Sequence, residues 1–179
     1  MATQIQSAKI VTEEIENAAG ANPYSITLGT ENTTTGGTAI DFIDIPSGVK
    51  RITVMFFALS ASGAGAWLVQ LGDSVGIETT GYVSRGGVLS LNATPQASTA
   101  GFIFNDAAGS ADAVYGTMNF YLEDASGFSW VADGLRNHGI VIDGGAGGKS
   151  LSSELTQLRI TTVSGSDTFD AGAINIQYQ

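Results

Sequence analysis

Short apolar segments alternate with glycine-containing turns along most of this chain, and this recurrence limits the fold more than any other feature. Within the segments apolar and polar residues alternate, as Ile52, Val54 and Phe56 do with their neighbours, which predicts sheets that bury one face. Gly, Ser and Pro mark the turns between them. The segments predicted as strands are residues 38–45, 51–59, 66–71, 99–105, 117–122, 128–132, 139–143, 157–163 and 173–178. We therefore expect an all-β protein with antiparallel pairing.

The number and spacing of these segments favour one architecture. The chain has 179 residues, which suits one domain. Irregular spacing favours an antiparallel β-sandwich of jelly-roll-like topology over an up-and-down barrel, which has a steadier hairpin rhythm. We expect this domain to span residues 38–179. The one internal helix expected is residues 150–158, where Leu151, Leu155 and Leu158 would share a face.

The N-terminal residues 1–22 differ from the rest of the chain. Ile5, Val11 and Ile15 belong to an apolar series with spacings of three or four, and Gly20 follows it. A short amphipathic helix and an extended arm are both consistent with this pattern, because Ile and Val are mediocre helix formers. In either form we expect an arm for attachment or oligomerisation.

Charge and composition exclude several classes of partner. Seven Lys and Arg against 17 Asp and Glu give a formal charge of -10, which opposes binding to nucleic acid. No apolar run has the length of a signal peptide or of a membrane span. The absence of Cys is consistent with synthesis in a reducing cytoplasm. We expect no nucleic-acid partner, no membrane insertion and no cofactor.

Residues 72–76 match the G-x-S-x-G pattern of hydrolases, with Ser74 in the nucleophile position. A nucleophile elbow needs a helix directly after the serine, whose backbone N–H groups support the oxyanion. The β-branched residues and Gly81 that follow favour a turn instead. We therefore expect no catalytic residue, and an esterase or carbohydrate-active enzyme that uses Ser74 is the alternative.

Residues 143–150 resemble a phosphate-binding loop, because they are rich in glycine and end in Gly-Lys-Ser. Asp143 stands where that motif has its first glycine, so a carboxylate would face the phosphates. The segment is predicted to be a flexible glycine-rich loop without nucleotide.

Aromatic residues are the candidate ligand-binding groups. Trp130, Phe128 and Tyr82 could stack on sugar rings, although large aromatic side chains more often serve a core or an interface. A spacing of two along a strand would place Trp130 and Phe128 on the same face.

Metal binding has weak support in the sequence. His138 is the sole histidine and Cys is absent, so no structural zinc site is expected. Oxygen ligands for Ca²⁺ are available without EF-hand spacing, so a calcium site stays open and no metal ligand is assigned. The acids in question are Asp41, Asp44, Asp106, Asp112, Asp167 and Asp170.

Several stretches resemble a pattern found in structural and tail-fibre proteins of tailed bacteriophages. They are IDFIDIPSGVKRITV (40–54), LVQLGDS (68–74), IETTGY (77–82), LRITTV (158–163) and DTFDAGAINI (167–176). The resemblance covers residues 38–178 and includes the Gly-Asp-Ser of the hydrolase-like motif.

The resemblance implies a non-enzymatic virion protein, made in the host cytoplasm and associated with a fibre or the tail. It implies contact with other virion proteins and assembly as a homotrimer, and a fibre tip would adsorb to host surface glycans. A capsid-decorating head fibre is the alternative.

Overall fold

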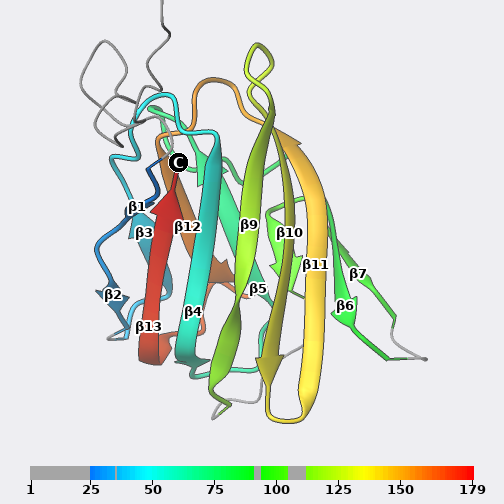
Figure 1. Cartoon of the computed structure of the whole chain (residues 1–179). Helices are drawn as coiled ribbons and strands as arrows, with labels where there is room; N and C mark the ends of the chain where they lie inside the picture. The colour runs from blue at the N-terminus through cyan, green and yellow to red at the C-terminus, as the bar shows by residue number, and fades with distance from the viewer. Residues whose placement is uncertain (1–24, 35, 91–93, 105–111) are drawn as a thin grey trace, which may run out of the picture.

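The structure of this protein, a computed structural model, describes residues 25–34, 36–90, 94–104 and 112–179. These residues form strands, turns and loops without a helix, so they contain none that could cross a membrane. The all-β prediction is confirmed (Figure 1). The strands are β1 (Thr27–Leu28), β2 (Asn32–Thr33), β3 (Ala39–Phe42), β4 (Arg51–Ala61), β5 (Trp67–Gly72), β6 (Val83–Val88), β7 (Gln96–Ser98), β8 (Phe102–Phe104), β9 (Val114–Asp124), β10 (Ser129–His138), β11 (Val141–Ser150), β12 (Gln157–Thr162) and β13 (Phe169–Tyr178).

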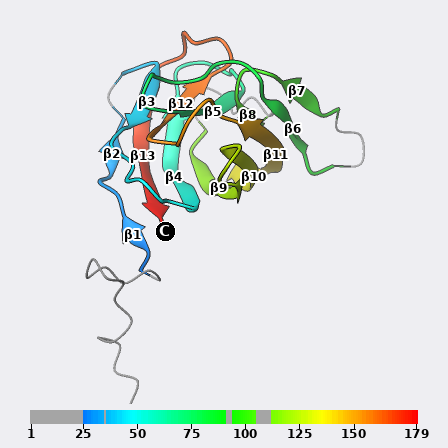
Figure 2. The same ribbon diagram turned by 90° about the horizontal axis from the view of Figure 1, so that it is seen from above.

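Two antiparallel sheets form a sandwich. The large sheet has the order β1-β13-β4-β9-β10-β11-β6-β7, with β2 also paired to β13, and the small sheet has the order β3-β12-β5-β8. Figure 2 shows the small sheet lying across one face of the large sheet, with β6 and β7 curling around its β8 end. The Ser84 hydroxyl accepts a hydrogen bond from the Ile103 backbone N–H at 3.0 Å, which ties β6 to β8 at this curl.

The strand order is that of a jelly roll with additional strands in the large sheet. A jelly roll places its eight strands, B to I, in the sheet orders B-I-D-G and C-H-E-F. Here β3, β12, β5 and β8 take the first order, and β4, β6 and β7 take the C, E and F places. The meander β9-β10-β11 occupies the single H place, and β13 adds a strand beside β4. The sandwich prediction is therefore confirmed.

Alternating side chains from both sheets fill the core. Trp67 lies at its centre, with ring centroids 5.9 Å from Phe56 and 5.7 Å from Phe169 in edge-to-face contacts. Phe56 also meets Phe104 at 5.9 Å. Ile52, Val54 and Phe56, whose alternation pointed to a buried face, are all buried.

The helix expected at residues 150–158 is wrong. Ser150 ends β11, Leu158 lies in β12, and the residues between them form a connection. The leucines are buried as expected, but the backbone bonds to other segments: Leu151 N–H donates to the Phe128 carbonyl at 3.1 Å, and Thr156 N–H donates to the Gly72 carbonyl at 3.0 Å. The apolar spacing predicted correctly that these leucines are buried, but it predicted the wrong backbone conformation.

The flexible loop expected at residues 143–150 is also wrong, because these residues belong to strand β11. Their glycines allow close approach of neighbouring backbone. A Cβ atom at Gly145 would lie 2.2 Å from the Ile103 carbonyl oxygen, and one at Gly147 would lie 2.4 Å from the Val83 carbonyl oxygen. Glycine here serves packing within and between the sheets.

Candidate functional site

The Ser74 segment forms a closed turn. The Asp73 carboxylate accepts the Val75 N–H at 2.8 Å, and backbone bonds join Asp73 and Gly76 in both directions. That bond from Val75, together with those from Ser153 and Gly76, holds the pKa of Asp73 below its usual value against the opposing effect of burial. No helix follows, so this turn has no helix N-terminus to support an oxyanion.

Ser74 and His138 lie at opposite ends of the sandwich. Asp73, the neighbour of Ser74, accepts a hydrogen bond from Ser153, which follows the end of β11 at Ser150. Ser150 pairs with Ser129, the first residue of β10. Ser74 therefore lies near the start of β10. His138 ends β10, nine residues after Ser129, which amounts to about 30 Å of strand. These two residues therefore cannot act together as nucleophile and base.

Lys149, the lysine of the segment that resembles a phosphate-binding loop, makes its contacts inside the protein. The Lys149 ammonium forms an ion pair with Glu78 and lies 5.3 Å from the centre of the Tyr82 ring. Burial pushes the pKa of Glu78 upward, but hydrogen bonds from Lys149 and Ser152 hold it below its ordinary value. Lys149 is itself buried, so its amine is not presented to a phosphate.

The proposed aromatic platform is not formed. Trp130 and Tyr82 are 2% and 1% exposed and belong to the core, so neither offers a ring face to a sugar. The Tyr82 hydroxyl accepts the Leu71 N–H at 2.7 Å and donates to the Glu78 carbonyl at 2.9 Å. Phe128 precedes β10 in a turn, with φ of 49°, so it does not share a strand face with Trp130.

The remaining candidates are dispersed or lie outside the described residues. Ile5, Val11 and Ile15 fall in residues 1–24 and Asp106 in residues 105–111, which the structure does not describe. Among the described residues no three His, Cys, Asp or Glu side chains come together as a metal site. Asp41, for example, pairs with Arg159 at 2.6 Å on the surface of the small sheet.

The outer face of the large sheet carries an unusual set of exposed side chains. The outward position of a solvated sheet is normally polar, yet Phe57, Leu89 and Leu135 are 68%, 65% and 54% exposed. Tyr115 stacks edge-to-face on Phe57 at 5.4 Å. The further exposed apolar residues on this face are Val83, Tyr121, Val131 and Ile142.

A row of side chains, polar except for Ala146 on β11, crosses this apolar face. Direct pairing places Thr53, Asn119, Asp133, Ala146 and Arg85 side by side on β4, β9, β10, β11 and β6. The Thr53 hydroxyl donates to Asn119 at 2.9 Å. Asp133 and Arg85, by contrast, make no ion pair or side-chain hydrogen bond within the described part of the chain.

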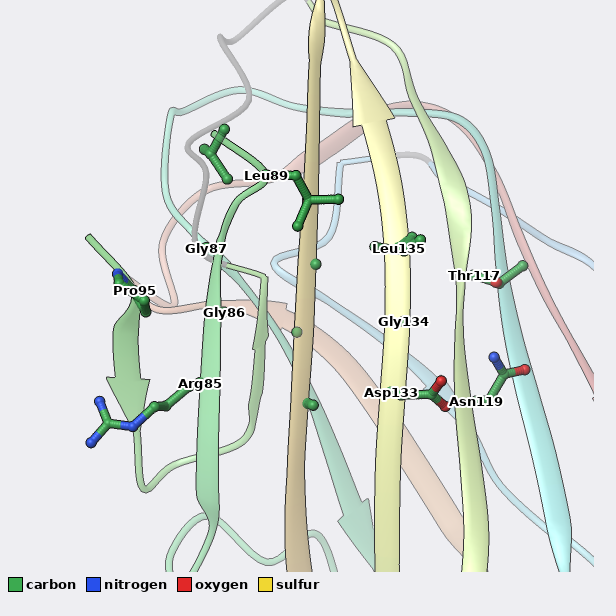
Figure 3. Close-up of a pocket in the computed structure, with 14 residues that line it drawn as sticks. Arg85, Gly86, Gly87, Leu89, Pro95, Thr117, Asn119, Asp133, Gly134 and Leu135 are labelled. Carbon is green, nitrogen blue, oxygen red and sulfur yellow. The ribbon is translucent and has the colours of Figure 1, made fainter. Parts of the chain in front are cut away.

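A glycine-floored hollow lies along this row, and we call it the glycine hollow. Its volume is about 620 Å³, and its lining includes Arg85, Gly87, Asp133, Leu135 and Gly144. Figure 3 shows Arg85 and Asp133 extending away from each other on opposite sides of β11. The lining contains no aromatic residue, so the hollow suits contact with another protein surface better than stacking on a sugar.

Sequence reasoning missed these residues for an identifiable reason. No strand is predicted between residues 71 and 99, whereas Arg85, Gly86 and Gly87 belong to β6. On β10, the outward positions Val131 and Leu135 on either side of Asp133 are apolar. Apolar residues on both faces of one strand were the available signal for a covered outer face.

Comparisons with known proteins returned no relative. No family model, no curated protein and no solved structure matches this chain.

Proposed function

We propose that this chain is a non-enzymatic structural subunit of a bacteriophage particle and that it works as an assembly of several copies. The observation that carries the proposal is the apolar outer face of the large sheet. Monomeric proteins rarely expose large contiguous apolar surfaces, and such surfaces mark contacts with other proteins. Covering the exposed rings and leucines of this face would stabilise an assembly.

Two further features support the proposal. Jelly-roll sandwiches are recurrent in viral capsid and lectin domains, which is an analogy at the level of the fold. Sequence stretches throughout the sandwich resemble phage structural and tail-fibre proteins. In this proposal the protein is made in the host cytoplasm and resides in the virion, with other virion proteins as partners. A place in a fibre or the tail is our first choice and a capsid-decorating fibre the second; adsorption to host glycans stays a prediction from the resemblance.

Electron microscopy of labelled particles tests the structural role. We expect gold-labelled antibody against the purified chain to bind at a repeated position on phage particles released by the host. The control is the same antibody pre-incubated with the purified protein, which should abolish labelling. Particles that lack the chain, while it is abundant in the host lysate, would contradict the proposal.

A hydrolysis assay tests the non-enzymatic half of the proposal. The wild-type chain and Ser74→Ala should behave alike on ester and glycan substrates, because Ser74 lies in a turn remote from His138. Turnover by the wild type that Ser74→Ala removes would establish the hydrolase alternative.

A further inference from the structure

The outer face of the large sheet carries one charge of each sign along a path across β4, β9 and β10. Arg51 on β4 is exposed and lies 5.4 Å from the centre of the Tyr121 ring on β9. Asp133 on β10 lies two strands across and two residues along from Arg51, a separation of about 12 Å. Neither charge takes part in an ion pair within the described residues. Both are therefore available to a further partner.

This path starts beside the first described residues of the chain. β1 pairs with β13, and β13 pairs with β4 (Figure 1), so β1 lies about 10 Å from β4. Ile26, directly before β1, lines a small hollow together with Arg51 and Thr53. At its far end the path reaches Asp133, which lines the glycine hollow. A chain that crosses the face from Ser25 would therefore meet Arg51 first and Asp133 second.

The sequence before Ser25, which lies outside the described residues, has charges in the matching order. Counting back from Ser25, Glu13 comes first and Lys9 four positions later. Four residues of extended chain cover about 13 Å, close to the separation of Arg51 and Asp133. Glu13 would thus meet Arg51, and Lys9 would meet Asp133 at the same time. The connection is long enough, because the twelve positions from Glu13 to Ser25 can span up to about 40 Å.

Alternation along this segment supplies an apolar face on the side of the two charges. In an extended chain every second residue points to the same face. The intervening positions 4, 6, 12, 14 and 16 are polar. One face of the extended segment would therefore carry Ile5, Lys9, Val11, Glu13 and Ile15.

The apolar residues of the segment match the surface along the path. Val11, midway between the two charges of the segment, would lie over Tyr121, which is 36% exposed. Ile5, four positions beyond the lysine, would reach the glycine hollow, whose lining includes Leu89 and Leu135. The glycines of that lining leave room for a further backbone. Docking would cover apolar surface that is otherwise in contact with water.

We infer that residues 5–15 dock in extended form on the outer face of the large sheet of their own chain, with Glu13 paired to Arg51 and Lys9 to Asp133. Attachment through β1, about 10 Å from β4, gives the segment a high effective concentration at this face. That proximity favours its own chain over a second copy. The inference goes beyond the proposed function, since it concerns the single chain, and the docked segment would compete with other copies for the same face.

Pairs of cysteines in the full-length chain test this arrangement, because the chain contains no Cys. The matched pairs are Lys9→Cys with Asp133→Cys, and Glu13→Cys with Arg51→Cys. The crossed pairs use the same four positions, as Lys9→Cys with Arg51→Cys, and Glu13→Cys with Asp133→Cys. Each thiol occurs in one matched and one crossed pair, so differences in thiol reactivity cancel.

Matched pairs should form the intrachain disulfide more readily than crossed pairs. In the docked segment the crossed positions would lie about 12 Å apart, beyond the reach of a disulfide of about 7 Å between Cα atoms. In dilute protein with a glutathione redox buffer, we expect the matched disulfides to be favoured about tenfold or more.

Charge reversal tests the pairing of Lys9 with Asp133 without cysteines. The measurement is the rate at which a glutamyl endopeptidase cleaves after Glu13. Lys9→Asp and Asp133→Lys each bring like charges together and should speed this cleavage about twofold to fivefold, the effect of an exposed ion pair. The chain with both substitutions should be cleaved at the wild-type rate. Arg159→Asp, on the outer face of the small sheet, is the matched control and should also be cleaved at that rate.

Three results would overturn the inference. Crossed pairs that form as readily as matched pairs exclude this register. Disulfides that form mainly between chains, detected as mixed products of chains labelled with light and heavy nitrogen, show that the segment binds a second copy. Single reversals that are cleaved at the wild-type rate exclude the pairing of Lys9 with Asp133. None of these results bears on whether the chain is in the particle, which the labelled micrographs decide separately.

Discussion

Replacing Arg136 by Met should destabilise the fold severely, because Arg136 and Asp143 form an ion pair inside the sandwich. The Arg136 Nε atom lies 2.9 and 3.1 Å from the two Asp143 carboxylate oxygens, and both side chains are fully buried. The guanidinium also lies 4.7 Å from the centre of the Trp67 ring and 5.0 Å from that of Phe104. Removing it leaves a buried carboxylate without this cation and removes two cation–π contacts.

The expected magnitude follows from these distances. At about 3 Å and an effective dielectric constant of about 20, the attraction is on the order of 5 kcal/mol. Breaking a buried pair from one side typically costs about 3–5 kcal/mol. Since domains are stable by about 5–15 kcal/mol, Arg136→Met should lose a large part of the free energy of unfolding. The double variant Arg136→Met, Asp143→Leu removes both charges and should recover most of that loss.

Urea denaturation followed by tryptophan fluorescence measures these changes, at one fixed chain concentration because association shifts apparent stability. The matched control is Arg159→Met, which breaks the half-exposed pair with Asp41 and should cost at most about 1 kcal/mol. The reasoning is refuted if Arg136→Met costs no more than Arg159→Met, or if the double variant is as unstable as the single one.

Two further predictions concern a buried hydroxyl and a buried glycine. Burial raises the pKa of Tyr82, so the folded state holds this proton more tightly; the associated stability is present below about pH 10 and is lost as the pH rises through the folded-state pKa. Absorbance titration at alkaline pH should show one late tyrosine that is missing in Tyr82→Phe, and a Tyr82 that titrates with the exposed tyrosines would contradict this. Gly145→Ala should lower the melting temperature, because its Cβ atom would lie 2.2 Å from the Ile103 carbonyl oxygen. In the control Gly148→Ala the nearest contact of the Cβ atom is at 3.7 Å, so this variant should melt like the wild type. Equal melting temperatures for the two variants would contradict the packing argument.

The strand content could be predicted from the sequence because most strands have one buried face. Ile52, Val54 and Phe56 on β4, and Ile174 and Ile176 on β13, alternate with more exposed residues. Strand β6 was missed because its Arg85, Gly86 and Gly87 have the composition of a turn. Its place in the sheet comes from pairing with β11, a contact between residues about 60 positions apart that local composition cannot reveal.

The candidate site was less predictable than the fold. Trp130 and Tyr82 were chosen as conspicuous rings, but ring size alone does not distinguish a binding face from a core. No local pattern in the sequence marks Asp133 and Arg85. Only the strand order shows that they lie on the same face and level with each other on either side of β11.

Cysteine cross-linking tests most directly whether copies meet through the outer face of the large sheet. The chain contains no Cys, so Asp133→Cys and Arg85→Cys together introduce the only two thiols. Within one chain these positions are about 10 Å apart, beyond the reach of a disulfide of about 7 Å between Cα atoms. Under mild oxidation we expect covalent species of two or more chains on a non-reducing gel. A double-cysteine chain that stays at the single-chain position under the same oxidation would contradict the account.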